Sequence, residues 1–181
     1  MALKPIIYKM HINLSDLDND HYDTLNLTVA QHPSETSERM MVRVIAYCLN
    51  TQEFLSFTKG LSVADDPDIW AKSLTDEFLL WIDVGEPAFE RIKKASRLTK
   101  SVKIYSFNTK SNVWWKQSSS NFKKLPNLDV YQFNFEQMQA LAKLLKRSMN
   151  FSVTISGDTV YIAAELGECE LICTALQDTR S

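Results

Sequence analysis

Glycine is scarce in this sequence, and the four glycines are widely separated: Gly60, Gly85, Gly157 and Gly167. A GxGxxG fingerprint or a P-loop needs closely spaced glycines, because the backbone must approach the phosphates without side chains in the way. The spacing therefore argues against the Rossmann and Walker types of nucleotide site, and we expect no nucleotide cofactor.

Cysteine and histidine are also rare. The three cysteines form no CxxC pair and are odd in number: Cys48, Cys169 and Cys173. The three histidines have no metal-ligand spacing: His11, His21 and His32. A disulfide framework or a zinc site is therefore not expected.

Long apolar runs are missing too. No stretch approaches the roughly 20 apolar residues of a membrane helix. The sequence passes from Met1–Pro5 directly into an alternating pattern and has no apolar core of a secretory signal. We therefore expect a cytoplasmic protein without a membrane partner. The 181 residues, 45% of them hydrophobic and with a net charge of −2, predict one globular domain over residues 1–181.

The N-terminal third predicts a hairpin and a helix. Apolar residues alternate over residues 8–14 and again over 25–29, with an Asp- and Asn-rich turn at 16–20, which is typical of an antiparallel hairpin. A helix is expected from Pro33-Ser34 to about residue 50. A further strand is expected over residues 55–61, followed by a loop at 64–68.

The middle of the chain predicts a βαβ unit. Residues 78–84 are the most continuous apolar run, as expected of a strand that is covered on both faces. Gly85 ends this strand, Pro87 suits the first turn of a helix that reaches Leu98, and residues 102–107 form the next strand. A strand, a short helix and a strand imply parallel pairing with a right-handed crossover.

The C-terminal third predicts a strand, a helix and a meander. A strand at residues 128–133 precedes Asn134 and Gln137, which resemble a capping box for a helix that reaches Leu145. Alternation over residues 151–155, 160–164 and 169–173 then indicates three more strands. The expected fold class is α/β with a mixed α+β sheet, an N-terminal hairpin and a C-terminal β-meander.

Two adjacent blocks of opposite charge lie in the middle of the chain. Residues 65–90 contain eight acidic residues and one basic residue, whereas residues 91–124 contain ten basic residues and no acidic one. Aromatic residues are interleaved with the basic block, and if the segment is extended, Trp114 and Trp115 point to opposite faces. Basic side chains neutralise phosphates and aromatic rings stack on bases, so the pattern is typical of a nucleic-acid surface beside a carboxylate site. In the other interpretation, the acidic and basic side chains are only exposed to solvent and the aromatic side chains belong to the core.

Two carboxylates are candidates for a buried site. Asp83 lies near the C-terminal end of the most buried strand, where ligand sites of open α/β sheets occur and where an unpaired charge is costly. Glu38 shares the apolar stripe of the first helix. The alternative for each is a buried salt bridge to Arg39, Arg43 or Arg91. On the helix after Asp83, Arg91 and Lys93 flank the sheet-facing side and reach back toward that carboxylate.

Several segments together resemble the YaeQ family over nearly the whole chain. They are residues 2–4 and 7–9, His32-Pro33-Ser34-Glu35-Thr36 with Glu38-Arg39-Met40, Phe57-Thr58 with Lys59-Gly60-Leu61, Trp81-Ile82 with Gly85 and Pro87, Arg91-Ile92-Lys93-Lys94-Ala95, and Trp114-Trp115. The resemblance implies a variant of the restriction-endonuclease-like PD-(D/E)XK nuclease fold, with Mg²⁺ or Mn²⁺ as cofactor.

The resemblance also implies residue roles. Glu38 corresponds to the helix acid, Asp66 or Asp68 to the upstream acid, with Asp65 and Asp76 as competitors, and Asp83 to the strand acid. The usual lysine position falls on Gly85, so Lys93 would supply that charge from the helix. The expected metal ligands are thus Glu38, Asp66 and Asp83, with Lys93 assisting catalysis. The expected nucleic-acid surface comprises Arg91, Lys94, Arg97, Lys103, Trp114 and Trp115.

Two functions follow from these residues. The first is a metal-dependent phosphodiesterase, as a nuclease acting on DNA or RNA. The second is a non-catalytic module that binds nucleic acid or protein on a nuclease-like fold. The sequence leaves the oligomeric state open.

Overall fold

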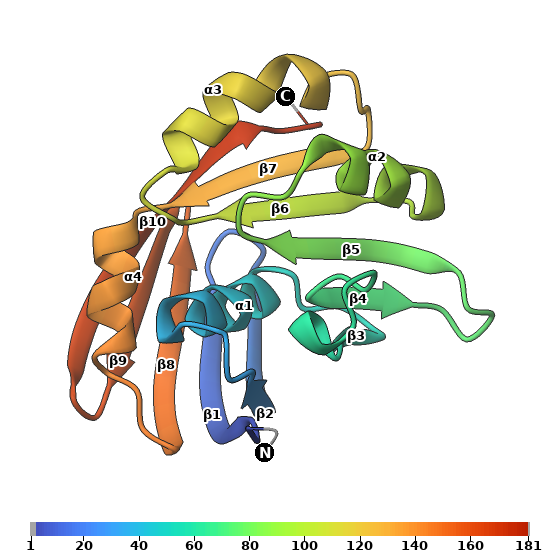
Figure 1. The fold of residues 1–181 in the computed structure, drawn as a ribbon. Coiled ribbons are helices and arrows are strands. Elements are labelled where there is room, and N and C mark those ends of the chain that lie inside the picture. Colours follow the sequence, from blue (N-terminus) through green and yellow to red (C-terminus); the bar gives the residue numbers. More distant parts are fainter. Residues whose placement is uncertain (1–2, 181) are drawn as a thin grey trace. The chain divides into compact units, whose positions relative to one another are not determined.

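The structure, a computed structural model, describes residues 3–180. The chain forms two compact units, and each unit combines segments that are distant in the sequence. The first unit contains residues 1–49 and 134–173, and the second contains residues 50–133 and 174–181. Helices and strands are mixed in both units, so the fold is of the mixed α+β class (Figure 1).

The sheet of the first unit is built from the predicted hairpin and the predicted meander. Its strands are β1 (Ile6–Asp16), β2 (His21–Gln31), β8 (Ser148–Ser156), β9 (Thr159–Ala164) and the first part of β10 (Gly167–Gln177). They lie in the order β2-β1-β8-β9-β10. The β1–β2, β8–β9 and β9–β10 pairs are antiparallel, and β1–β8 is parallel. Both the hairpin and the meander are therefore confirmed.

Alternation decides which face of this sheet is buried. In β1, Tyr8, Met10, Ile12 and Leu14 are buried, and the residues between them are exposed or half-buried. Helices α1 (Ser37–Leu49) and α4 (Phe135–Ala142) contact each other in the same unit. The predicted cap of α4 is confirmed, because the Asn134 side chain accepts a hydrogen bond of 3.0 Å from the Gln137 amide. Helix α4 ends at Ala142, three residues before the expected Leu145.

The sheet of the second unit is centred on parallel strands. Its elements are β3 (Leu55–Phe57), the short 3-10 helix η1 (Gly60–Ser62), β4 (Ile69–Lys72), β5 (Phe78–Val84), α2 (Phe89–Leu98), β6 (Val102–Ser106), α3 (Ser111–Phe122) and β7 (Leu128–Phe133). The strand order is β7-β6-β5-β4-β3. Strands β5, β6 and β7 are parallel, and β3–β4 and β4–β5 are antiparallel. The predicted βαβ unit, in which α2 connects β5 to β6, is confirmed.

One local expectation was wrong, and two elements were not predicted. The expected strand over residues 55–61 stops at Phe57, because Gly60 has a φ of +56° and begins η1. Strand β4 was missed, because four residues directly after the acidic loop are too few for a clear alternating pattern. The segment around Trp114 and Trp115 is the helix α3 and not extended. Its three consecutive serines hide the helical pattern, although Trp114, Trp115, Ser118 and Phe122 do recur at helical spacing.

Helices α2 and α3 share one apolar core with the parallel strands. Ile92 of α2 and Phe122 of α3 are fully buried against Val102 and Ile104 of β6. Full burial of side chains of this size contributes about 1.5–3 kcal/mol each, which fixes both helices on the same face of the sheet. Among residues 3–180, no helix is long and apolar enough to cross a membrane.

Candidate functional site

The most buried candidate carboxylate, Asp83, is held by an arginine. Asp83 is the penultimate residue of β5, and its side chain is 4% exposed. Arg91 Nε donates to its Oδ2 at 2.6 Å, and Arg91 Nη2 donates to its Oδ1 at 3.3 Å. Arg91 lies at the third position of α2, so the helix that follows β5 does return its side chain toward Asp83, as expected. Asp83 is therefore one half of an ion pair, the arrangement foreseen as its alternative role.

The same arginine also fixes the acidic loop. Arg91 Nη2 donates to the carbonyl oxygen of Asp66 at 2.7 Å, and Nη1 donates to that of Ala64. The hydrogen bond to Asp83 raises the pKa of Arg91, with the nearby charges of Asp68 and Asp65 acting in the same direction. The guanidinium thus links β5, α2 and the loop at 64–66 and stays charged at every ordinary pH.

The neighbouring acid Asp68 has a structural partner as well. Asp68 is buried, and its Oδ2 accepts a hydrogen bond of 2.8 Å from the backbone N–H of Val84. Its backbone joins the same network, since the Asp68 amide donates to the Ile82 carbonyl at 3.0 Å. Asp68 therefore extends the β4–β5 pairing at the end where Asp83 lies.

The other predicted members of the metal site have surroundings of their own. Asp66 is half-buried in the loop, and Lys93 Nζ lies 6.0 Å from the centre of the Phe89 ring. Glu38 is half-buried in the first turn of α1, in the first unit. Among residues 3–180, no group of three or more His, Cys, Asp or Glu side chains is placed to hold a metal ion.

The implied Mg²⁺ does not fit the donor set around Asp83. A divalent cation prefers several carboxylate or carbonyl oxygens that are free to converge on it. Here both oxygens of Asp83 accept from a guanidinium, and one oxygen of Asp68 is taken by a backbone amide. A cation bound at Asp83 would have to displace Arg91 or share its carboxylate with a positive charge.

Glu35 is a buried acid that the sequence patterns did not single out. Its carboxylate accepts from Arg39 Nη1 at 2.7 Å and from Arg43 Nη2 at 2.6 Å, and Glu35 is 6% exposed. The spacing of four and eight residues from Glu35 to the two arginines was the available signal. Glu35, rather than Glu38, is therefore the fully paired acid at the start of α1.

Glu86 is a second acid whose carboxylate accepts hydrogen bonds from another loop. Its Oε1 accepts from Asn108 Nδ2 at 2.6 Å, and its Oε2 accepts from the Phe107 amide at 3.2 Å. Ser111 Oγ, at the start of α3, lies 3.4 Å from the same Oε2. Glu86 thus connects the loop after β5 to the loop after β6.

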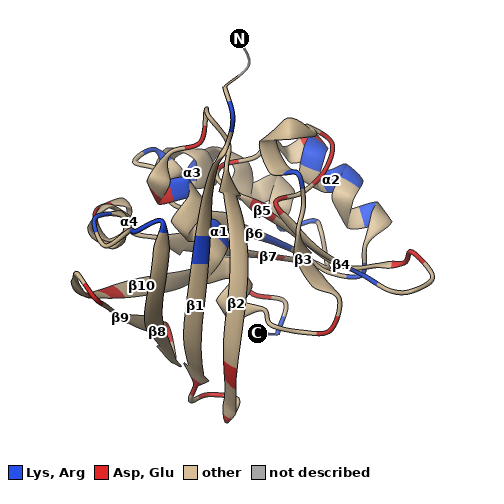
Figure 2. Cartoon of the chain, turned by 90° about the horizontal axis from the view of Figure 1, so that it is seen from below, with Lys and Arg blue, Asp and Glu red and all other residues tan. Residues whose placement is uncertain are grey.

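The basic block forms a charged surface on the two helices of the second unit. Figure 2 shows basic residues along α2, and Lys116 lies on α3. We define the basic helical surface by six exposed cations on or directly beside these helices: Lys94, Arg97, Lys110, Lys116, Lys123 and Lys124. Within residues 3–180 none of these six makes an ion pair. Their charge is therefore available to an external anion.

The remaining basic residues of the block are otherwise engaged. Arg91 is committed to Asp83, and Lys100 pairs with Glu77 at 3.3 Å. Lys103 lies between the buried Val102 and Ile104 of β6, so it points to the sheet face opposite α2 and α3. There its Nζ donates to Asn50 Oδ1 at 2.7 Å. Arg91 and Lys103, both expected at the nucleic-acid surface, thus have hydrogen-bond partners within the second unit.

Both tryptophans of α3 face the core. Trp114 and Trp115 are half-buried against the shared core, and Trp115 stacks on Phe122 with an angle of 7° between the rings. Trp114 Nε1 donates to the Pro87 carbonyl at 2.9 Å. The rings therefore hold α3 on the sheet, as in the interpretation that places the aromatic residues in the core.

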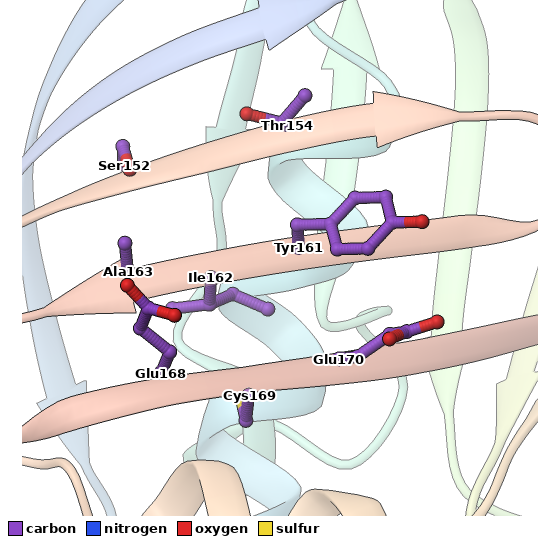
Figure 3. A pocket seen from close by; sticks show the side chains of 8 residues that line it. All are labelled: Ser152, Thr154, Tyr161, Ile162, Ala163, Glu168, Cys169 and Glu170. Atoms are coloured by element: carbon purple, nitrogen blue, oxygen red, sulfur yellow. The ribbon is translucent and has the colours of Figure 1, made fainter.

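The first unit has a shallow depression of a different character. It measures about 420 Å³ and lies over β8, β9 and β10. Figure 3 shows Tyr161 beside Glu170 and Ala163 beside Glu168 along neighbouring strands. The charged residues of its lining are acidic, and no basic side chain lines it. This depression is therefore unsuited to a phosphate ligand.

Comparison with known proteins decides the family. The family model described as YaeQ protein matches residues 1–173. The chain belongs to the YaeQ family. "Uncharacterized protein YaeQ" of Escherichia coli K12 is 35% identical over 178 residues, with 98% of each chain covered. The same name is printed for the relative from Salmonella typhi, which is 36% identical with the same coverage.

Two solved YaeQ structures have the same fold. The YaeQ protein from Xanthomonas axonopodis pv. citri gives a TM-score of 0.93 at 33% identity, covering 96% of this chain and 98% of that one. The YaeQ protein from Pseudomonas syringae gives a TM-score of 0.92 at 36% identity, covering 98% of each chain. The resemblance drawn from sequence segments is thus confirmed at the level of the family.

Proposed function

We propose that this member of the YaeQ family is a non-catalytic nucleic-acid-binding module that contacts phosphates through the basic helical surface. The observation that carries the proposal is the set of six exposed cations on and beside α2 and α3 that have no ion-pair partner within residues 3–180. A backbone of phosphates releases counterions when such side chains neutralise it, and this release drives binding in a salt-dependent manner.

The charge pattern around this surface favours a polyanion. Residues 91–124 contain no acidic residue, so no carboxylate on this stretch offsets the cations. The nearest acid on α2, Glu90, is exposed on its first turn. The net charge of −2 for the whole chain means that this positive region is local, which orients an anionic partner toward one face of the second unit.

Metal-dependent hydrolysis is the weaker proposal for the same fold. Its ligands would be the acids that the family resemblance implies, Glu38, Asp66 and Asp83, with Lys93 assisting. The pairing of Asp83 with Arg91 opposes this arrangement, because the guanidinium already neutralises the carboxylate that a metal would use.

Salt-dependent binding tests the proposal directly. Fluorescence anisotropy with a labelled 20-nucleotide probe should show binding that weakens steeply between about 50 and 200 mM salt and is unaffected by EDTA. The double variant Lys94→Ala, Arg97→Ala should weaken binding and lower the salt slope by about 2. The matched control, Lys9→Ala with Lys143→Ala, removes two exposed cations from the first unit and should leave binding unchanged.

A nuclease assay separates binding from catalysis. Incubation of the same probe with the protein and Mg²⁺ or Mn²⁺ should leave the probe intact. Isothermal titration of either ion should give the same heat for the wild-type protein and for Asp83→Asn. Cleavage by the wild-type protein that disappears in Asp83→Asn would refute the non-catalytic proposal.

A further inference from the structure

The basic helical surface has no exposed aromatic ring. The large aromatic side chains that are exposed within residues 3–180 are Tyr22 at 60%, Phe54 at 38% and Tyr161 at 47%. None of them lies on α2, α3 or the segments beside them. On α3, Phe122 is fully buried, and Trp114 and Trp115 are half-buried against the same core.

The tryptophans of α3 are fixed in that orientation by specific contacts. Trp114 lies 5.6 Å and Trp115 lies 6.2 Å from the Phe122 ring, and Phe122 is fully buried. The hydrogen bond of Trp114 to the Pro87 carbonyl adds a directional tie to the loop before α2. Turning either ring outward would open the core and break these contacts, so both half-buried rings stay packed against the core.

This arrangement bears on the kind of nucleic acid. Proteins that bind single strands combine a basic groove with aromatic rings on which successive bases stack, and each stacked base contributes about 1–3 kcal/mol. A duplex keeps its bases internal and presents only phosphates and grooves to such a surface. It also carries one charge per about 1.7 Å of its axis, which is denser than a single strand.

We infer that the basic helical surface selects double-stranded over single-stranded nucleic acid and binds it through the phosphate backbone without regard to sequence. This inference rests on the nucleic-acid binding proposed above and specifies the form of its ligand. Charge supplies the whole attraction, so affinity follows the phosphate density of the ligand and not its bases.

The contact geometry also sets the expected salt dependence. Six cations are available, and a surface carried by two short helices brings only part of them against phosphates at once. With about four contacts, the slope of log K against log salt is about −3.6 for a duplex and about −2.8 for a single strand. Replacing two of the contacting cations should reduce the duplex slope by about 1.8.

The experiment compares four labelled probes of 20 nucleotides or base pairs by anisotropy, at several salt concentrations. The probes are two duplexes of unrelated sequence and one single strand of each sequence. Tryptophan emission is recorded in the same titrations, because a base that stacks on an indole quenches it. The expected result is equal affinity for both duplexes, at least tenfold weaker affinity for the single strands, and unchanged tryptophan emission.

The outcomes are distinguishable. Single strands that bind as tightly as duplexes, with quenched tryptophan emission, would overturn this inference while leaving nucleic-acid binding in place. A tenfold or larger preference for one duplex sequence would also overturn it, because phosphate contacts carry no sequence information. No binding of any probe at about 50 mM salt would overturn the proposed function itself.

Discussion

The ion pair between Asp83 and Arg91 predicts a large loss of stability when only one partner is removed. In Arg91→Ala, the Asp83 carboxylate, with its side chain 4% exposed, loses the guanidinium that donates to both of its oxygens. The carbonyl oxygens of Ala64 and Asp66 lose a donor at the same time. Removing one partner of a buried pair typically costs about 3–5 kcal/mol.

The exposure of Arg91 lowers this figure. Its side chain is 34% exposed, so water reaches the site and offsets part of the penalty. We expect Arg91→Ala to reduce the free energy of unfolding by about 2–3 kcal/mol. Asp83→Asn keeps the size and a hydrogen-bond acceptor and should cost about 1–2 kcal/mol. The double variant should cost less than the sum of the two, since both changes remove the same ion pair.

Urea unfolding, followed by circular dichroism, measures these values. With a slope of about 2–3 kcal/mol per molar urea, Arg91→Ala lowers the midpoint by about 1 M. Lys94→Ala, an exposed change one turn further along α2, is the control and should fall within about 0.5 kcal/mol of the wild type. An Arg91→Ala midpoint equal to that of this control would refute the structural role of the pair.

Three further predictions address single positions. Gly85 has a φ of +113°, so Gly85→Ala should cost about 1–3 kcal/mol of stability, measured by thermal unfolding. The control is Gly157→Asn, at a φ of +60° that asparagine tolerates, which should cost less than about 1 kcal/mol. Equal losses in the two variants would contradict the strain at Gly85. Glu35→Gln should lower the free energy of unfolding by about 2–4 kcal/mol, because two arginines donate to that carboxylate. Glu38→Gln should cost less than about 1 kcal/mol. A larger loss for Glu38→Gln than for Glu35→Gln would disprove this order. Burial raises the pKa of the Cys169 thiol to about 11, so its reactive thiolate is scarce at pH 8. With alanine at the other two cysteines, its alkylation by iodoacetamide should run at least tenfold slower than that of free cysteine and keep accelerating up to about pH 11, and a rate that levels off near pH 9 would count against this.

The sequence by itself determined most of the local structure. Alternating apolar residues fixed the hairpin of β1 and β2 and the meander of β8, β9 and β10, because a period of two is compatible only with a strand that has one buried face. The continuous apolar run of β5, ended by Gly85, fixed a central strand followed by a helix. Short segments of particular residues, in one order, were enough to indicate the YaeQ family.

The ion-pair partners of the buried acids, however, were decided by tertiary structure. The sequence placed Asp83 at the end of a buried strand but left open whether a metal or an arginine would neutralise it. Only the return of α2 over β5 brought Arg91 to 2.6 Å from that carboxylate. Periodicity likewise could not tell that Glu35 rather than Glu38 would be the buried acid, because that depends on where Arg39 and Arg43 extend.

The same limit applies to the aromatic residues of the basic block. A composition of lysines and tryptophans is equally compatible with a stacking surface and with a charged helix over a core. The difference is the direction in which each side chain points, which follows from the axis of α3 and the position of Phe122 beneath it. Local pattern thus determined which residues are helical or extended, and packing between distant segments decided which charges and rings remain available to a ligand.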